Sequence, residues 1–592
     1  MTTIAAALRS RAVIGNTVPP IGALGVVSLI TAALVVAPIA AVVWNIFLPS
    51  EATWAHLIST VLPEYTANTL VLLVLVAAGV VCCGVLSAWL VTAYQFPGRG
   101  ALEWALVLPM AIPAYVMAYA YTDWLQTAGP VQSMLRELTG WRVREYWFPE
   151  IRSLPGAATM LSFALYPYVY LLARSAFLEQ SRSSYEAAQL AGYGAWGRFW
   201  HVSLPLARTG IVAGVALALM ETLADFGTVS YFAVNTFTAG IYRAWLSLGD
   251  SVAAGQLATC LLVFVLAMLA LERIHRGGAR YTSNRAPISS QPLGGARALG
   301  AFTLCATPVA FGFVVPAAIL LELALTDPQV QFGTRITGLI TNTFILAGVA
   351  AMVAVIVAML LAYAARTAKS PLVQTANRLA VLGYALPGAV IAVGILLPLG
   401  KLDNALIAWL HEQFGVRTGL ILTGSVTALI YAYLVRFLAV AFQTVEAGLT
   451  RVTSSMDDAA RSLGLSPGRA LVRVHMPIMR SSVATAALLV FVDVLKELPA
   501  TFAMRPFNFD TLAVEAYNLA KDERIAEAAL PALLIVAIAL LPLILLSRQI
   551  ANSSRRRRND ALGDPATALE PNRIRSHEVL FIAAPGKRTE AS

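Results

Sequence analysis

Charged residues are scarce in this sequence. Lysine, arginine, aspartate and glutamate make up 12% of its 592 residues, whereas hydrophobic residues make up 58%. A soluble protein of this length needs roughly 25% charged residues to cover its surface. The shortage indicates that lipid surrounds most of the chain. The net charge of +10 would suggest nucleic-acid binding in a soluble protein, but here the basic residues cluster at the ends of apolar stretches, which is a signal of membrane topology.

Cysteine is also rare. The four cysteines, Cys82, Cys83, Cys260 and Cys305, all lie inside apolar runs, and no CxxC pair occurs. This pattern argues against a disulfide framework and against a zinc site. We expect these residues to act as small apolar filler.

Nucleotide-binding and catalytic motifs are missing as well. The segment from Gly394 to Leu402 resembles a phosphate loop, but five residues separate its glycines instead of four, and leucine follows Lys401. The segment that begins at His411 is not an HExxH motif, and the six histidines are scattered. We therefore expect that the chain is not an enzyme and that it binds no ATP or other cofactor itself.

Long apolar runs dominate the chain instead. A membrane-spanning helix needs about 20 apolar residues, and twelve candidate spans meet this requirement, six in each half. They lie near residues 21–47, 69–92, 104–127, 155–178, 209–232 and 252–271, and near 301–325, 343–365, 379–400, 419–445, 481–503 and 526–547. The first run is too long for the apolar region of a signal peptide, which has roughly 7–15 residues, so we expect a retained span.

Basic residues orient these spans. Arginines precede the first span, flank the loop after the fourth and follow the sixth and twelfth, so the positive-inside rule puts both termini in the cytoplasm. The expected organisation is residues 1–65 with the first span, a first half at 66–271, a cytoplasmic linker at 272–299, residues 300–339 with the seventh span and an external loop, a second half at 340–547, and a disordered basic tail at 548–592.

An internal repeat relates the two halves. The segment Ser183–Gly192, followed by Pro205, matches the segment Ser455–Gly464, followed by Pro477, at a constant offset of 272. Upstream, Asn68 and Pro113 match Asn342 and Pro387 at an offset of 274. Because each half holds an even number of spans, both copies face the same side of the membrane. The sequence predicts two parallel six-helix repeats.

The repeated segment has the features of an elbow outside the membrane. Ser183 and Ser455 stand three residues before Glu186 and Asp458, which is the spacing of a capping box. A short helix follows, and Gly192 or Gly464 is expected to end it in a left-handed conformation. In the second copy, Ser466 and Pro467 begin another short helix. One interpretation of such an elbow is a stiff loop that only connects spans, but two copies on one side suggest two docking sites for a two-fold symmetric partner.

The motif in these elbows resembles the EAA loop of binding-protein-dependent ABC transporter permeases. The second copy departs mildly from it, with Asp458 for glutamate and Met476 for leucine. The resemblance implies a type I ABC importer (MetI-like) permease fold in the bacterial inner membrane, two copies of a cytoplasmic ATPase that carries ATP and magnesium, and an external binding protein. The residues implied to couple the permease to the ATPase are Ser183, Glu186, Ala187, Ala188, Gly192, Pro205, Ser455, Asp458, Ala459, Ala460, Gly464 and Pro477.

A narrower resemblance concerns the substrate. The segments that begin at Ala224 and Thr236 in the first half, and at Lys496 and Arg505 in the second, look like those of the ferric-iron subgroup, and the fusion of two halves is similar. Thiamine and phosphonate permeases are alternatives within the same class. A secondary carrier is an alternative from another class, but it would need no duplicated elbow.

Four carboxylates are predicted inside the spans. Glu221 and Asp225 match Asp493 and Glu497 at the offset of 272, and each pair has the i, i+4 spacing of one helix face. Carboxylates in a span usually face an interior cavity, and four of them suit a hard cation. Two tyrosines, Tyr231 and Tyr242, are candidates for further oxygen ligands.

The alternative is a structural role for these carboxylates, with Lys496 neutralising Glu497 or with hydrogen bonds holding the acids at the external mouth. We expect no stable metal site in either case, because conduction needs weak binding.

Overall fold

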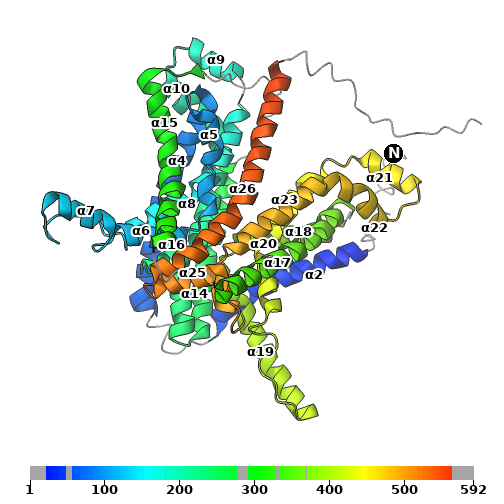
Figure 1. Cartoon of the computed structure of the whole chain (residues 1–592). Helices are drawn as coiled ribbons and strands as arrows, with labels where there is room; N and C mark the ends of the chain where they lie inside the picture. The colour runs from blue at the N-terminus through cyan, green and yellow to red at the C-terminus, as the bar shows by residue number, and fades with distance from the viewer. Residues whose placement is uncertain are drawn as a thin grey trace, which may run out of the picture. The chain divides into compact units, whose positions relative to one another are not determined.

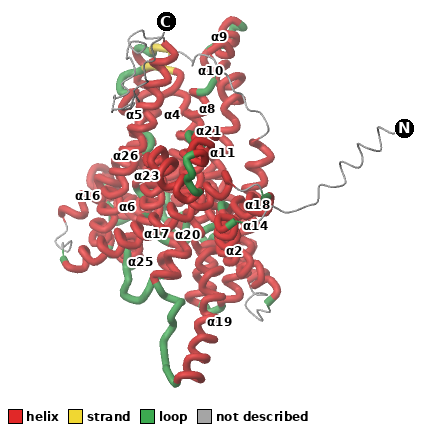
Figure 2. The backbone as a smooth tube through the Cα atoms, turned by 90° about the vertical axis from the view of Figure 1, so that its right-hand side faces the viewer, coloured by secondary structure: helices red, strands yellow, loops and turns green. Residues whose placement is uncertain are grey.

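The computed structural model of the chain describes residues 22–48, 57–143, 145–180, 182–276, 291–326, 333–367 and 370–562. Almost all of its regular structure is helical (Figure 1, Figure 2). Within these ranges, eleven helices are long and apolar enough to cross a membrane, or twelve if one sharply bent pair is counted as a span. The all-α polytopic architecture is therefore confirmed. The chain forms one compact unit up to Ser547 and a second unit from Arg548.

Six predicted spans in each half correspond to helices with the following bounds. In the first half they are α2 (Ala23–Trp44) with η1 (Asn45–Phe47), α4 (Leu62–Ala93) after η2 (Leu57–Val61), α5 (Arg99–Ala105) with η3 (Leu108–Ala111) and α6 (Ala114–Leu125), α8 (Leu154–Leu178), α11 (Leu204–Ala224), and α14 (Ser251–Arg276). In the second half they are α15 (Gly295–Val309) with η6 (Ala310–Val314) and α16 (Val315–Thr326), α17 (Thr334–Thr367), α19 (Gly388–Phe414), α20 (Val426–Leu449), α23 (Met476–Leu495), and α26 (Ile525–Leu562).

The third span of each half is broken at a proline. In the first half, the helices on either side of Pro113 meet at 91°, and α7 (Pro130–Thr139) extends the second of them. In the second half, α18 (Pro371–Ala380) and η7 (Leu382–Ala385) precede Pro387, and α19 begins directly after it. Proline lacks an amide hydrogen and disfavours a helical residue before it. The continuous spans expected at 104–127 and 379–400 were therefore wrong.

The fifth and eleventh spans end earlier than expected. Helix α11 stops at Ala224 and α23 at Leu495, whereas the predicted spans ran to 232 and 503. Short helices follow in both halves: α12 (Gly227–Tyr231), α13 (Phe237–Tyr242) and η5 (Arg243–Ser247), and α24 (Pro499–Met504) and α25 (Leu512–Lys521). The breaks arise because a carboxylate at each point bonds the amides of the next short helix.

The two halves repeat each other in local detail. Ser153 and Ser425, at the offset of 272, each accept a hydrogen bond from the amide three residues later, at 3.2 and 3.1 Å, and so cap α8 and α20. The side-chain amides of Asn68 and Asn342 both donate to a backbone carbonyl of the loop after the fifth span of their half, at 3.0 and 3.2 Å. These matched contacts confirm the repeat as a structural one.

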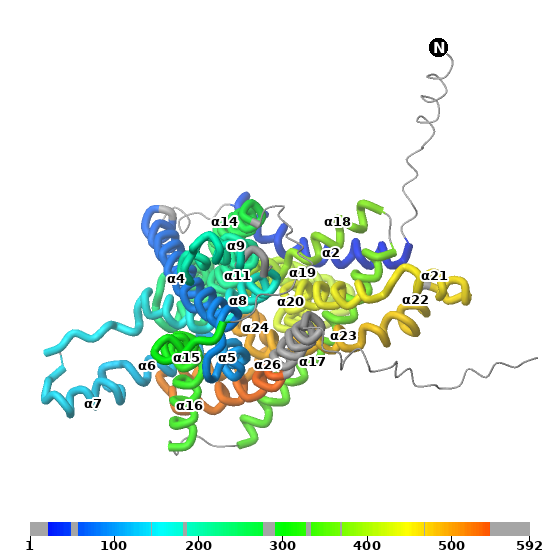
Figure 3. Tube along the Cα trace, turned by 90° about the horizontal axis from the view of Figure 1, so that it is seen from above, coloured from blue at the N-terminus to red at the C-terminus, as the bar shows by residue number. Residues whose placement is uncertain are grey.

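The first helix of each half packs on the other half. Helix α2 lies against α17, α18 and α19, while α15 and α16 contact α4, α5 and α6 (Figure 1, Figure 3). Two hydrophobic cores reflect this exchange. One combines the first half with α25 and the beginning of α26, and the other combines the second half with Ala32 and Val35 of α2.

A proline inside α2 leaves one backbone carbonyl of the helix without its helical partner, and a residue of the second half bonds it instead. Pro38 has no amide hydrogen, so the carbonyl of Leu34 lacks its usual partner four residues later. The hydroxyl of Tyr431, from α20, donates to that carbonyl at 2.5 Å. Close by, Gly394 of α19 lets the backbone approach, because a Cβ there would stand 2.4 Å from the carbonyl oxygen of Pro38. Residues of the second half therefore contact the backbone carbonyls of α2 directly.

Two expectations concern the segments between and after the halves. The predicted linker at 272–299 lies partly outside the described residues, and both its ends are helical, because α14 runs to Arg276 and α15 begins at Gly295. Between them, β2 (Gln291–Pro292) pairs in parallel with β1 (Tyr94–Gln95), which follows the second span. The predicted disordered tail differs as well, because α26 continues to Leu562. Residues 563–592 lie outside the described part of the chain.

Candidate functional site

A small cavity lies where the two halves meet. Its volume is about 120 Å³, and its walls come from the broken third span, α8 and α11 of the first half, from α20 and α23 of the second, and from the loops that follow α11 and α23. Six charged side chains line it: Glu221, Asp225, Arg436, Asp493, Lys496 and Glu497. The structure therefore brings the four predicted carboxylates together, and it adds two cations. The formal charge of this set is −2.

Two of the four carboxylates cap short helices. Asp225 accepts hydrogen bonds from the amides of Thr228 and Val229 at 3.0 and 3.1 Å. Glu497 accepts from the amides of Ala500 and Thr501 at 2.8 and 2.9 Å. A carboxylate at a helix N-terminus satisfies amides that have no helical partner and is favoured by the helix dipole. Both residues therefore have a structural function, whatever they contribute to a pathway.

The expected placement of each pair on one helix face was wrong. Glu221 and Asp493 belong to α11 and α23, but Asp225 and Glu497 lie beyond the ends of those helices, at Ala224 and Leu495. The partner expected for Glu497 was wrong too. Lys496 pairs with Asp493 of its own helix end at 3.2 Å, and the cation beside Glu497 is Arg436.

Arg436 joins carboxylates from both halves. Its guanidinium lies 3.1 Å from Glu497 and 3.8 Å from Glu221. The side chain is almost fully buried in α20. Space for it exists because residue 388 is a glycine, since a Cβ at Gly388 would lie 2.4 Å from the Arg436 Nη1 atom and 2.8 Å from the Glu497 Oε1 atom. Sequence reasoning missed Arg436.

The two tyrosines proposed as oxygen ligands lie elsewhere. The hydroxyl of Tyr231 accepts a hydrogen bond from Arg152 at 3.4 Å, and that of Tyr242 donates to the carbonyl of Pro499 at 2.5 Å. Neither lines the cavity, whereas Tyr115 and Tyr168 do. In the described part of the chain, no group of three or more His, Cys, Asp or Glu side chains is placed to hold a metal ion. The cavity provides charge without a formed ligand set.

The two elbows form a second candidate site. The first contains α9 (Arg182–Leu190), α10 (Ala195–Arg198) and the π-helix η4 (Phe199–Ser203), and the second contains α21 (Ser454–Ser462), α22 (Pro467–Ala470) and the π-helix η8 (Leu471–His475). Each π-helix precedes the matching proline, Pro205 or Pro477, by two residues. A proline leaves a carbonyl of the preceding turn without its usual amide, which a wider turn accommodates.

Both elbows turn at a glycine in the same way. The φ angles of Gly192 and Gly464 are +84° and +74°, in the left-handed region that favours glycine. The amide of Tyr193 donates a hydrogen bond to the carbonyl of Ala188 at 3.1 Å, and the amide of Leu465 donates to the carbonyl of Ala460 at 3.0 Å. This is a Schellman motif. The predicted glycine turns are confirmed, while their role in docking a partner stays a prediction.

The paired alanines differ in exposure. Ala188 and Ala460 are buried under the elbow, whereas Ala187 and Ala459 are exposed. We expected both alanines of each copy to form a surface for a partner, but only one of them is exposed in each elbow. One alanine packs within the elbow, and the other remains open to a partner.

The capping boxes were predicted wrongly in the second copy. Helix α21 begins at Ser454 with Thr453 at its N-cap and without a side-chain capping bond. Asp458 instead pairs with Arg461 at 2.5 Å on the exposed surface. In the first copy, α9 begins at Arg182, one residue before Ser183, and the Ser183 side chain lies outside the described part.

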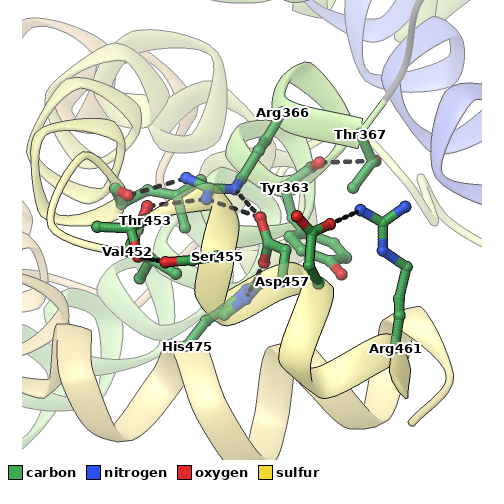
Figure 4. A network of polar contacts seen from close by, with 11 residues as sticks. Tyr363, Arg366, Thr367, Val452, Thr453, Ser455, Asp457, Arg461 and His475 are labelled. Carbon is green, nitrogen blue, oxygen red and sulfur yellow. Dashed lines mark hydrogen bonds and ion pairs between the residues drawn. The ribbon is translucent and has the colours of Figure 1, made fainter. Parts of the chain in front are cut away.

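Asp457, the residue before Asp458, anchors the second elbow (Figure 4). Asp457 accepts hydrogen bonds from Arg366, at the end of α17, at 2.7 and 2.9 Å, and lies 2.7 Å from a ring nitrogen of His475. Arg366 also donates to the carbonyls of Leu449 and Val452. Burial opposes ionisation of Asp457, but its bonds with Arg366 and then His475 outweigh burial, so the pKa of Asp457 lies below its ordinary value.

The first elbow is anchored differently. Trp89 of α4 stacks on Trp196 with ring centroids 5.8 Å apart and lies 4.6 Å from the ring of Phe199. At the offset of 274, Trp89 matches Tyr363 of α17, which packs edge-on against His475 at 5.3 Å. An aromatic cluster therefore holds the first elbow to its span, and an ionic network holds the second.

Comparison with known sequences decides the family. The sequence profile of "Binding-protein-dependent transport system inner membrane component" matches residues 80–277 and again residues 362–559. The chain belongs to this family. It is a multi-pass permease of an ABC importer in which two copies of the family's domain are fused, as the repeat and the elbows predicted.

Individual relatives carry different substrate names. The chain is 25% identical to the Fe(3+)-transport system permease protein FbpB 2 of Haemophilus influenzae, over 82% of this chain and 90% of that protein. It is 30% identical to the molybdenum transport system permease protein ModB of Escherichia coli, over 32% of this chain and 81% of the relative. A sulfate transport system permease protein, CysW of Escherichia coli, is 33% identical over 25% of this chain and 48% of the relative.

Proposed function

We propose that this permease carries ferric iron across the inner membrane. The observation that carries the proposal is the similarity to an Fe(3+) permease along both halves, over 82% of the chain. The molybdenum and sulfate relatives match only 32% and 25% of it. Fusion of two halves in one chain is thus shared with the iron relative over nearly its whole length.

The charge of the central cavity supports a cationic cargo. Its lining has two more carboxylates than cations, and a cavity with low-dielectric walls concentrates ions of the opposite charge. An oxyanion would meet the same excess negative charge unfavourably. In this proposal, Glu221 and Asp493 form the wall of the pathway, while Asp225 and Glu497 contribute charge and also hold α12 and α24.

The elbows are proposed to dock two copies of a cytoplasmic ATPase that binds ATP and magnesium. The matched Schellman turns at Gly192 and Gly464 support two equivalent docking positions. Each elbow also exposes a large apolar side chain, Leu190 at 90% and Leu463 at 80%, and such side chains suit a protein interface. An external binding protein would deliver the iron, both termini would be cytoplasmic, and rocking of the halves would alternate access.

Transport by the reconstituted complex tests the proposal. The permease, its ATPase and its binding protein are placed in proteoliposomes, and ATP-dependent uptake of ferric iron, sulfate and molybdate is measured side by side. We expect uptake of iron alone. Uptake of an oxyanion without iron would reject the cargo, and it would favour the second candidate function suggested by the molybdenum and sulfate relatives.

A further inference from the structure

Arg436 occupies a position that couples the two halves. It belongs to α20 of the second half, and its guanidinium lies between Glu497 of the same half, at 3.1 Å, and Glu221 of the first half, at 3.8 Å. Only 8% of Arg436 is exposed. The cavity beside it has a volume of about 120 Å³, which is room for several water molecules.

The two contacts of Arg436 differ in strength. Glu497 is also held by the amides of Ala500 and Thr501, so Arg436, Glu497 and α24 form a fixed group within the second half. The contact with Glu221 is longer and is not a hydrogen bond. If the halves separate, Arg436 stays with Glu497 and leaves Glu221.

The first half has no counterpart of this group. At the offset of 272, Arg436 matches Ala164 of α8, which also lines the cavity. At the offset of 274, Gly388, whose missing side chain makes room for the guanidinium, matches Ala114. Arg436 and the glycine that makes room for it therefore both belong to the second half alone, where they lie beside Glu221 of the first half.

We propose that the Arg436–Glu221 contact keeps the pathway closed and must break before cargo passes. Arg436 neutralises Glu221 in the closed state. When the halves move apart, the Glu221 carboxylate is freed to face the pathway, where it attracts a cation. The closing role requires only that the chain is a two-half permease, but the attraction of cargo by Glu221 rests on the proposed iron function.

Access to a cysteine in the cavity wall tests the closing role without any cargo. Leu165 lines the cavity, and Leu165→Cys is introduced into full-length chain whose four cysteines are replaced by alanine. The protein is placed in nanodiscs, so that both faces are reachable, and the rate of modification by a charged methanethiosulfonate is measured. Glu221→Gln and Arg436→Met should each raise the rate about tenfold, because each shifts the population towards open states.

Three further measurements separate this role from simple loosening. Gly388→Ala, which displaces the guanidinium without removing its charge, should also raise the rate. The modification rate of the Glu221→Gln, Arg436→Met double variant should equal that of the faster single variant, because both substitutions remove the same Arg436–Glu221 contact. Arg524→Met, which removes an exposed Arg–Glu pair within one helix end, should leave the rate unchanged.

A parental rate in Glu221→Gln with an unchanged melting temperature would overturn the proposal, as would multiplied effects in the double variant. This outcome is independent of iron uptake, so the closing role and the iron assignment can fail separately.

Discussion

Two adjacent aspartates at the second elbow have opposite surroundings. Asp457 contacts Arg366 and His475, and 26% of its side chain is exposed, whereas the Asp458 side chain is 68% exposed and contacts Arg461. The repeat pointed to Asp458, because it aligns with Glu186. Alignment identifies the shared position, but the anchoring residue has no acidic counterpart in the first half, where Tyr185 stands at the same offset.

We predict that Asp457→Asn destabilises the second elbow far more than Asp458→Asn. Hydrogen bonds to charged groups contribute about 1.5–3 kcal/mol, and the variant weakens bonds to two partners. An exposed ion pair contributes about 0–1 kcal/mol. Thermal unfolding and protease cleavage in the elbow, measured on purified protein, should separate the two variants. Equal behaviour would contradict an anchoring role for Asp457.

The lowered pKa of Asp457 predicts a pH dependence. A carboxyl whose folded-state pKa is depressed contributes its full stability above the ordinary value of about 4 and loses it as the pH falls through the folded-state pKa. The difference in melting temperature between the parent and Asp457→Asn should therefore be smaller at about pH 3 than at about pH 5. A difference that grows as the pH falls from about 5 to about 3 would reject this account.

The cavity illustrates what the sequence could and could not predict at this scale. Glu221, Asp225, Asp493 and Glu497 were found because they repeat at one offset within apolar runs. Arg436 was missed because it does not repeat. One signal was available: Gly388 directly follows Pro387, where the first half has Ala114, but a glycine alone does not tell which side chain fills the space.

At the scale of elements, the boundaries missed by the sequence share one cause. Apolar composition continues past Pro113, Asp225 and Glu497, so hydropathy predicts unbroken spans there. Backbone hydrogen bonding decides otherwise, because proline removes a donor and a carboxylate bonds the amides of a new helix. The glycine turns of the elbows were predictable, since a left-handed residue after a short helix strongly favours glycine.

We predict that Gly192→Ala and Gly464→Ala each weaken their elbow. Nothing lies within 4 Å of a Cβ at either position, so the cost is purely that of a left-handed alanine, about 1–2 kcal/mol. Gly468→Ala, also with open space but inside α22, is the matched control and should be neutral or stabilising. Co-purification of the proposed ATPase should fall in the double variant Gly192→Ala, Gly464→Ala and remain normal in the control.

At the scale of the whole molecule, the exchange of first helices was not predictable. The sequence divides the chain into consecutive halves, but α2 packs on α17, α18 and α19. Neighbours in sequence usually pack together, and an evenly apolar helix has no residue pattern that predicts which helix it packs on. The contact is specified at single positions, such as the glycine of α19 that lies against Pro38.

We predict that Gly394→Ala destabilises the molecule by about 1–3 kcal/mol, since its Cβ would meet the carbonyl of Pro38 at 2.4 Å and an overpacked contact costs about that much. Gly400→Ala, on the same helix with open space around it, serves as the control and should be neutral or stabilising. Thermal unfolding of the detergent-purified protein measures both. Equal melting temperatures would contradict close packing of α2 on α19.

The dependence of α2 on the second half has a consequence for biosynthesis. Helix α2 ends at Trp44 and α17 begins at Thr334, so the ribosome makes residues 45–333 before the first of its partner helices in the second half starts to appear. At about 5–20 residues per second, translation of this stretch takes roughly 15–60 s. During that time the Leu34 carbonyl lacks Tyr431, and the Pro38 carbonyl lacks its neighbour Gly394. Truncation of the nascent chain before α17 would therefore leave the first span inserted with its α14 contact but without its partners in the second half, and exposed to quality-control proteases.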